Sequence, residues 1–180
     1  MNAPLIGARV QRKEDYRFLT GTGQYTDDVA LPNQSYAVFV RSPHAHAKIG
    51  KISAEAARKS SGVLAVYTGE DLAAAKVGGL PCGWLITDVN GKPMKEPPYP
   101  PLAQGKVRHV GERVAVVVAD TLEQARDAAE KVKVDYEELP AVIDLTKAKT
   151  STPIHDIAGD NTCYVWALGD KAAVDAAFAK

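Results

Sequence analysis

An apolar run, Arg113–Ala119 (RVAVVVA), constrains the fold of this chain more than any other feature. Seven mostly β-branched residues are short for a helix and are typical of a strand that is covered on both faces. On this reading Val116 lies in the core, and Val116→Asp is expected to unfold the domain, because an unpaired charge would replace a buried side chain. The run belongs to a longer block, residues 105–144, whose pattern predicts strand, turn, strand, helix and strand in that order.

The second half of this block has clear helix and strand signals. Asp120 or Thr121 can cap the helix, because each side-chain oxygen can accept a bond from a first-turn amide. The alternation in Lys133–Glu137 favours a strand with one solvent-facing side, and Pro140 ends it. Four apolar residues recur at helical spacing and predict the packed face of the helix: Leu122, Ala125, Ala129 and Val132.

Shorter elements are predicted before the block. Strands are expected at Tyr36–Arg41, Lys48–Ser53 and Gly62–Tyr67. Ser53 is expected to cap a short helix over residues 54–59, and Thr68 a second one that includes residues 72–75.

Two segments are predicted to have little regular secondary structure. Residues 1–35 are polar and rich in turn formers, which predicts an extended arm that lies across a partner surface, because such a long arm inside a compact domain would be unusual. Residues 78–104 hold many prolines and glycines and predict a surface loop or lid, with one strand at residues 84–87.

Composition narrows the classes of partner. The chain has 22 basic and 22 acidic residues, so charge gives no reason to expect nucleic acid or an anionic membrane. No apolar run approaches the roughly twenty residues that cross a bilayer. The N-terminus lacks a signal-peptide hydrophobic region, so cytoplasm is the default compartment. Cys82 and Cys163 have no metal-site spacing and are expected to be free thiols.

Several residues invite a chemical interpretation that the pattern does not support. Gly21 and Gly23 lack the third glycine, the preceding strand and the following helix of a dinucleotide fingerprint. His44 and His46 could share a metal only if a distant ligand joined them, and otherwise would bond to backbone at a strand end or an interface. The possible distant ligands are His109, His155, Asp27 and Asp28.

The remaining polar and aromatic groups are weaker candidates still. Adjacent carboxylates, at Asp27–Asp28 and Glu137–Glu138, point to opposite sides of an extended chain and do not form an acid–base pair. The larger aromatic residues are too scattered for a base-stacking platform: Tyr16, Tyr25, Tyr99, Trp84 and Trp166. No serine or cysteine has a nucleophile motif. The sequence therefore assigns no catalytic, cofactor-binding or metal-binding residue.

The end of the chain predicts an interrupted element. A strand is expected at Tyr164–Leu168, followed by a helix capped by Asp170. Its expected inner face carries Ala173, Val174, Ala177 and Phe178. The helix reaches the last residue, Lys180, without a stop signal, and the strand that it should lead to is absent, so truncation is expected.

Four segments, in this order, resemble one family. They are residues 12–21 (RKEDYRFLTG) with 25–28 (YTDD), 40–49 (VRSPHAHAKI), 106–121 (KVRHVGERVAVVVADT) and 134–142 (VDYEELPAV). Together they resemble the start of the large, molybdenum-binding subunit of the xanthine dehydrogenase, aldehyde oxidase and carbon monoxide dehydrogenase group, and the first two look most similar to the bacterial carbon monoxide dehydrogenase type. The likeness extends over essentially the whole chain.

The resemblance implies a fold and a division of the chain. The family's α/β hammerhead domain is an α+β unit, expected here as a mixed sheet with packed helices and an extended N-terminal arm. Residues 1–35 would be the arm, residues 36–150 the hammerhead-like domain, and residues 151–180 the truncated start of the molybdopterin-binding region.

The resemblance also implies an activity for the full-length parent. Family members hydroxylate an electrophilic carbon oxidatively at molybdenum, with a glutamate base, and a variant with copper oxidises carbon monoxide. The implied cofactor is molybdopterin cytosine dinucleotide, and the implied partner subunits carry [2Fe–2S] clusters and FAD. The family's glutamate and cofactor-binding motifs match no position here, so this piece alone is expected to be inactive and to form homo- or hetero-oligomers. The alternative is a freestanding, non-catalytic α+β interaction module.

Overall fold

The computed structural model describes residues 6–179. Residues 1–5 of the expected arm, and Lys180 at the end of the expected truncated helix, lie outside the described residues. The contacts divide the chain into two units, one up to Gln34 and one from Ser35 onward. Each unit is described by itself.

The first unit contains little regular structure. It has one helical turn and a half, α1 (Asp15–Leu19), and a short 3-10 helix, η1 (Thr26–Asp28). Neither helix buries a residue. The rings of Phe18 and Tyr25 stack with centroids 5.8 Å apart, which is the main apolar contact inside the unit. These residues therefore do not form a hydrophobic core of their own.

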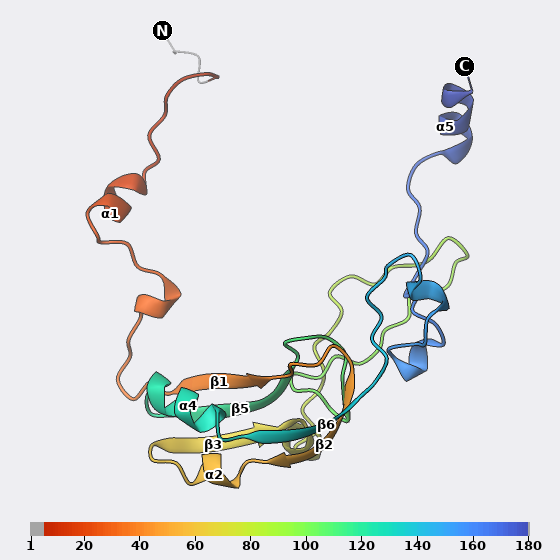
Figure 1. Cartoon of the computed structure of the whole chain (residues 1–180). Coiled ribbons are helices and arrows are strands. Elements are labelled where there is room, and N and C mark those ends of the chain that lie inside the picture. Colours follow the sequence, from red (N-terminus) through yellow and green to blue (C-terminus); the bar gives the residue numbers. More distant parts are fainter. Residues whose placement is uncertain (1–5, 180) are drawn as a thin grey trace. The chain divides into compact units, whose positions relative to one another are not determined.

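The second unit is built on two three-stranded antiparallel sheets (Figure 1). The first has the order β1 (Tyr36–Arg41), β5 (Arg113–Ala119), β3 (Val63–Thr68). The second has the order β4 (Lys106–Val107), β2 (Ala47–Ser53), β6 (Lys133–Glu138). The predicted α+β class is confirmed. The expectation of one mixed sheet is corrected in two respects. The described strands form two sheets, and every strand pair in them is antiparallel.

Three short helices join the strands, and their starts follow local side-chain chemistry. They are α2 (Glu55–Arg58), α3 (Gly69–Ala74) and α4 (Leu122–Ala129). Thr68 caps α3 as predicted, and of the two predicted caps for α4 Thr121 is the one used. Both belong to capping boxes, in which the third helical residue bonds back to the cap amide. The prediction for α2 is wrong in detail, since its cap is Ala54 and makes no side-chain bond.

The main core lies between the first sheet and the helices. Figure 1 shows α4 over the sheet, where it packs against β1, β5 and β3. Ala125 and Ala128 of α4 are fully buried near Ala115 and Val117 of β5. The predicted packed face of α4 is thus shifted, because Ala128 is buried while Leu122 and Ala129 remain partly exposed. Alanine on α4 lets the helix lie close to the sheet.

A smaller core joins the two sheets at the start of β5. Val114 is buried with Ala47, Ala103 and Val107. Beyond that point the same face of β5 is open, because Val116 and Val118 are only half-buried. The prediction of a strand covered on both faces is therefore wrong for this part of β5, and so is the placement of Val116 in the core.

Two long segments, residues 76–105 and residues 139–179, run largely outside the two sheets. The strands predicted at residues 84–87 and at Tyr164–Leu168 do not form. A single bridge pairs Thr87 with Pro93, and the Cys163 carbonyl accepts a bond from the Lys95 amide at 3.0 Å. Two 3-10 helices follow β6, η2 (Ala148–Thr150) and η3 (Asp156–Ala158).

The last described helix is α5 (Lys171–Phe178), and Asp170 caps it as predicted. The helix buries none of its residues. Its predicted inner-face residues, Ala173, Val174, Ala177 and Phe178, are all exposed, so within the described chain that face packs against nothing.

Candidate functional site

The two histidines singled out by sequence lie in the turn between β1 and β2, and they make separate contacts. His44 Nδ1 lies 3.3 Å from a carboxylate oxygen of Glu138, and its ring packs on Tyr136 with centroids 4.8 Å apart. His46 is buried, and its Nδ1 lies 2.8 Å from the Pro140 carbonyl oxygen. The alternative to a shared metal, a histidine bonded to backbone at a strand end, therefore describes His46.

His46 belongs to a polar cluster that sequence spacing does not reveal. We use "His155 cluster" for His155 together with Arg108, Glu112 and His46. These three side chains lie close enough to influence the pKa of the His155 ring. Burial, and then the Arg108 guanidinium, lower the pKa of His155. The buried Glu112 carboxylate accepts a bond from the Arg108 amide. His46 Nε2 and Arg108 Nε are buried, and neither has a hydrogen-bond partner among residues 6–179.

A cavity of about 330 Å³ lies beside this cluster. Arg108, His109, His155 and Asn161 contribute polar groups to its wall, and Val142, Leu145 and Ile154 contribute apolar ones. Asn161 is held in place, since its amide donates to the Ala148 carbonyl at 2.8 Å and its oxygen accepts from the Ile154 amide at 2.8 Å. Cys163 also lines the cavity, but among the described residues its thiol makes no hydrogen bond to His109 or His155, so the polar wall holds no assembled nucleophile–base pair.

The lowered pKa of His155 predicts acid sensitivity of the fold. Below the ordinary histidine pKa of about 6.5 the unfolded chain binds more protons than the folded chain, so stability falls as pH drops from neutral toward 5. Urea unfolding at pH 7.5 and 5.5 should give a lower midpoint at the acid pH. His155→Gln should reduce that difference, because it removes the group whose pKa burial lowers. An equal pH response in His155→Gln and the parent chain would contradict the role of His155.

The remaining sequence candidates do not converge on one site. Gly21 and Gly23 follow the C-terminus of α1, so they do not precede a helix as a phosphate loop would. Asp28 accepts the Tyr25 amide in a turn of the first unit. Glu137 pairs with Lys48 at 2.8 Å on an exposed surface. Among residues 6–179, no group of three or more histidine, cysteine or acidic side chains could hold a metal ion.

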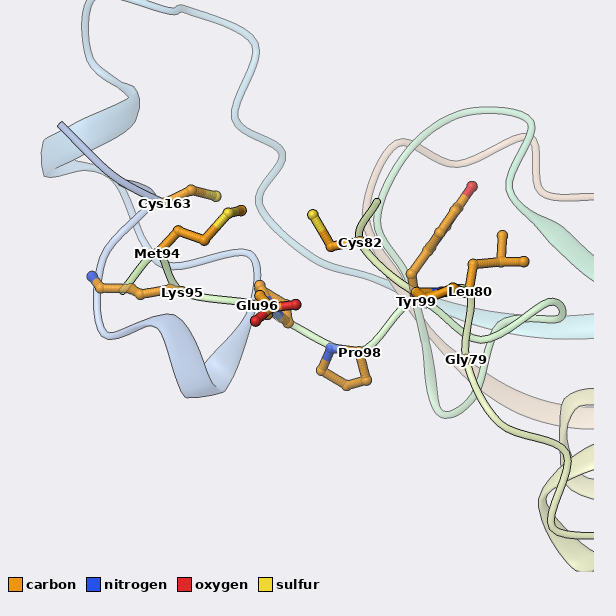
Figure 2. A pocket seen from close by; sticks show the side chains of 11 residues that line it. Gly79, Leu80, Cys82, Met94, Lys95, Glu96, Pro98, Tyr99 and Cys163 are labelled. Atoms are coloured by element: carbon orange, nitrogen blue, oxygen red, sulfur yellow. The ribbon is translucent and has the colours of Figure 1, made fainter. Parts of the chain in front are cut away.

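The two cysteines, 81 positions apart in sequence, line one pocket of about 640 Å³ (Figure 2). Both are free and exposed. The pocket wall comes mostly from the proline-rich loop, with Leu80 and Tyr99 near Cys82 and Met94 near Cys163. The Cys82 thiol donates to the Trp84 carbonyl at 3.3 Å. The wall is mainly apolar, and among the described residues neither thiol is hydrogen-bonded to the Glu96 carboxylate that also lines it, so the pocket suits contact better than nucleophilic catalysis.

The described residues do not fit the implied molybdopterin group. The phosphates of a dinucleotide bind to backbone amides at a helix N-terminus or in a nest. Gly21 and Gly23 instead follow the C-terminus of α1. A Cβ at Gly23 would lie 2.7 Å from the Phe18 ring, so packing against Phe18 explains this glycine. No step of chemistry is therefore assigned to these residues. Within the same described range, no helix has the length and hydropathy to span a bilayer.

Comparison with known proteins identifies what the chain is similar to. Residues 20–140 match the family model described as "Aldehyde oxidase and xanthine dehydrogenase, a/b hammerhead domain". The carbon monoxide dehydrogenase large chain of Hydrogenophaga pseudoflava is 38% identical over 99% of this chain and 24% of its own length. The xanthine dehydrogenase molybdenum-binding subunit of Escherichia coli O157:H7 is 36% identical over 77% of this chain and 18% of its own length.

A solved structure gives the same result for the fold. The crystal structure of the Cu,Mo-CO dehydrogenase matches 97% of this chain with a TM-score of 0.74 and 35% identity, and the match covers 22% of that chain. The chain thus spans about a quarter or less of the length of these relatives.

Proposed function

The chain belongs to the aldehyde oxidase and xanthine dehydrogenase family, and from this premise we propose that it is the N-terminal structural and subunit-contact portion of a molybdenum hydroxylase large subunit. The match to the hammerhead domain over residues 20–140 is the observation that carries the proposal. The relatives include a carbon monoxide dehydrogenase large chain and a xanthine dehydrogenase molybdenum-binding subunit. The proposed parent is therefore an oxidoreductase, and its substrate stays open between these types.

The surface of the chain supports a contact role. The first unit exposes Val10, Tyr16, Leu19 and Leu31 without a core of its own. Exposed apolar residues in such number mark a surface that another protein segment covers. We propose that this arm lies on a neighbouring subunit and that residues 151–180 begin the molybdopterin-binding region.

The cofactors of the proposed parent lie outside these residues. When bound, molybdopterin cytosine dinucleotide would supply the molybdenum centre at which the substrate is oxidised, and [2Fe–2S] and FAD subunits would carry the electrons away. The piece alone should therefore be inactive. Purified residues 1–180 should contain no molybdenum by elemental analysis and should oxidise neither carbon monoxide, xanthine nor an aldehyde.

The size of the natural product tests the proposal directly. An immunoblot of the source cell, with an antibody against residues 36–150, should show a band about four to six times the mass of this chain, because the chain covers 18–24% of its relatives. Molybdenum should co-purify with that band. A band at 19.2 kDa alone would refute the proposal.

A band at 19.2 kDa alone would favour the alternative, a freestanding interaction module. The fragment and the module also differ in their expected behaviour in solution. A fragment with uncovered contact surfaces should self-associate or dissolve poorly. A stable, highly soluble monomer of 180 residues would favour the module.

A further inference from the structure

One face of the β1-β5-β3 sheet is left uncovered by residues 35–179. The strand register places Phe39, Val116 and Tyr67 in one row across the sheet. The next row contains Ala37, Val118 and Ala65. Paired residues of antiparallel strands point to the same side, so these six form one surface, which we name the open sheet face. The opposite face packs under α4.

The open sheet face is apolar and accessible. Phe39 and Tyr67 are 40% and 47% exposed, and Val116 and Val118 between them are half-buried. A sheet with two apolar faces normally has a packed layer on each. The strands also hold this surface rigidly, since β5 is paired on both sides. The surface is therefore preformed for a covering segment.

Two arginines at one end of the face define the chemistry of that segment. The guanidinium carbons of Arg41 and Arg113 each lie 5.8 Å from the centroid of the Phe39 ring. Arg41 donates to the Gly111 carbonyl at 2.9 Å, and Arg113 donates to the Tyr99 hydroxyl at 3.3 Å. Neither arginine is in an ion pair with a carboxylate of residues 6–179. A covering segment with a carboxylate at this end would pair with them.

We propose that the open sheet face is covered by the polypeptide that follows residue 180 in the full-length large subunit, through an apolar segment that carries an acidic residue. This inference rests on the proposed function. Relatives extend far beyond the matched region, since this chain covers 24% and 22% of two of them, so most of the polypeptide is available as the occupant. A segment of the same chain is also favoured over a separate subunit because the tether keeps its local concentration high.

Photo-crosslinking in the full-length large subunit tests the proposal. The full gene is expressed with its partner subunits, and a benzophenone amino acid is placed at one position of the face, as Phe39→p-benzoylphenylalanine or Tyr67→p-benzoylphenylalanine. The same substitution at Asp127, an exposed residue of α4, gives the background. After irradiation, mass spectrometry of the digested complex identifies the peptide attached to each position.

The expected product is an intramolecular crosslink from positions 39 and 67 to a peptide beyond residue 180 that contains Asp or Glu. Arg41→Glu with Arg113→Glu should lower the yield of this product. Crosslinks to an iron–sulfur or flavin subunit, to a second copy, or to nothing would overturn the proposal. An unchanged yield in the arginine double variant would overturn the acidic character of the occupant. A purified product of only 180 residues would instead refute the proposed function, so the two failures are distinguishable.

Discussion

Val117→Asp should unfold the 180-residue chain, whereas Val116→Asp, one residue earlier on the same strand, should leave it folded. The Val117 side chain is fully buried in the core under α4, together with Ala115 and Ala128. An aspartate there would be an unpaired buried charge and should cost about 4 kcal/mol or more, a large part of the stability of an ordinary domain.

The neighbouring substitution is the matched control. Val116 points to the open sheet face, where an aspartate keeps access to water and lies on the same face as Phe39, against which Arg41 and Arg113 pack. We expect a loss of roughly 1 kcal/mol, mainly from lower strand propensity. Far-UV circular dichroism and urea unfolding of both variants provide the measurement. Equal destabilisation by the two would mean that β5 is covered on both faces, as its composition alone suggested.

The contrast between Val116 and Val117 separates what the local sequence predicts, a strand, from what it does not predict, the burial of each face of that strand. The run Arg113–Ala119 predicts a strand correctly, because β-branched residues favour extended backbone at any site. Thr121 could be named as a candidate cap for the same reason, since a cap depends only on the next three residues. The degree of cover on each face depends on elements far away in sequence. Here α4 covers one side, while on the other side Val116 and Val118 remain half-buried.

The polar groups around His155 also depend on contacts between residues that are far apart in sequence. The sequence offered His46 as one of a local histidine pair and His155 as one of several distant ligands for that pair, and nothing local indicated Arg108 or Glu112. The turn between β4 and β5 brings Arg108 and Glu112 together, and the long segment after β6 brings His155 to them. The strands expected at residues 84–87 and Tyr164–Leu168 failed for a related reason. The Ile86 carbonyl accepts from the Met94 amide within one loop, and the Val165 carbonyl accepts from the Val89 amide of that loop, so isolated bonds form in place of a ladder.

Gly69→Ala should destabilise the chain by about 1–3 kcal/mol, the range typical of an overfilled, well-packed site. Gly69 is the first residue of α3 and is buried. A Cβ at this position would lie 2.1 Å from the Ala103 carbonyl oxygen. That carbonyl cannot move away easily, because Ala103 is itself buried in the smaller core and its amide donates to the Arg113 carbonyl at 2.7 Å.

Gly78→Ala is the matched control, since no atom lies within 4 Å of the position that its Cβ would take. The loss of chain entropy on folding is smaller for alanine than for glycine, so this variant should be neutral or slightly more stable. The midpoints of urea unfolding for the two variants and the parent chain provide the comparison. Parent-like stability of Gly69→Ala would show that the 102–104 segment yields to α3. A large loss would show that the close approach of α3 to Ala103 is what requires glycine at position 69.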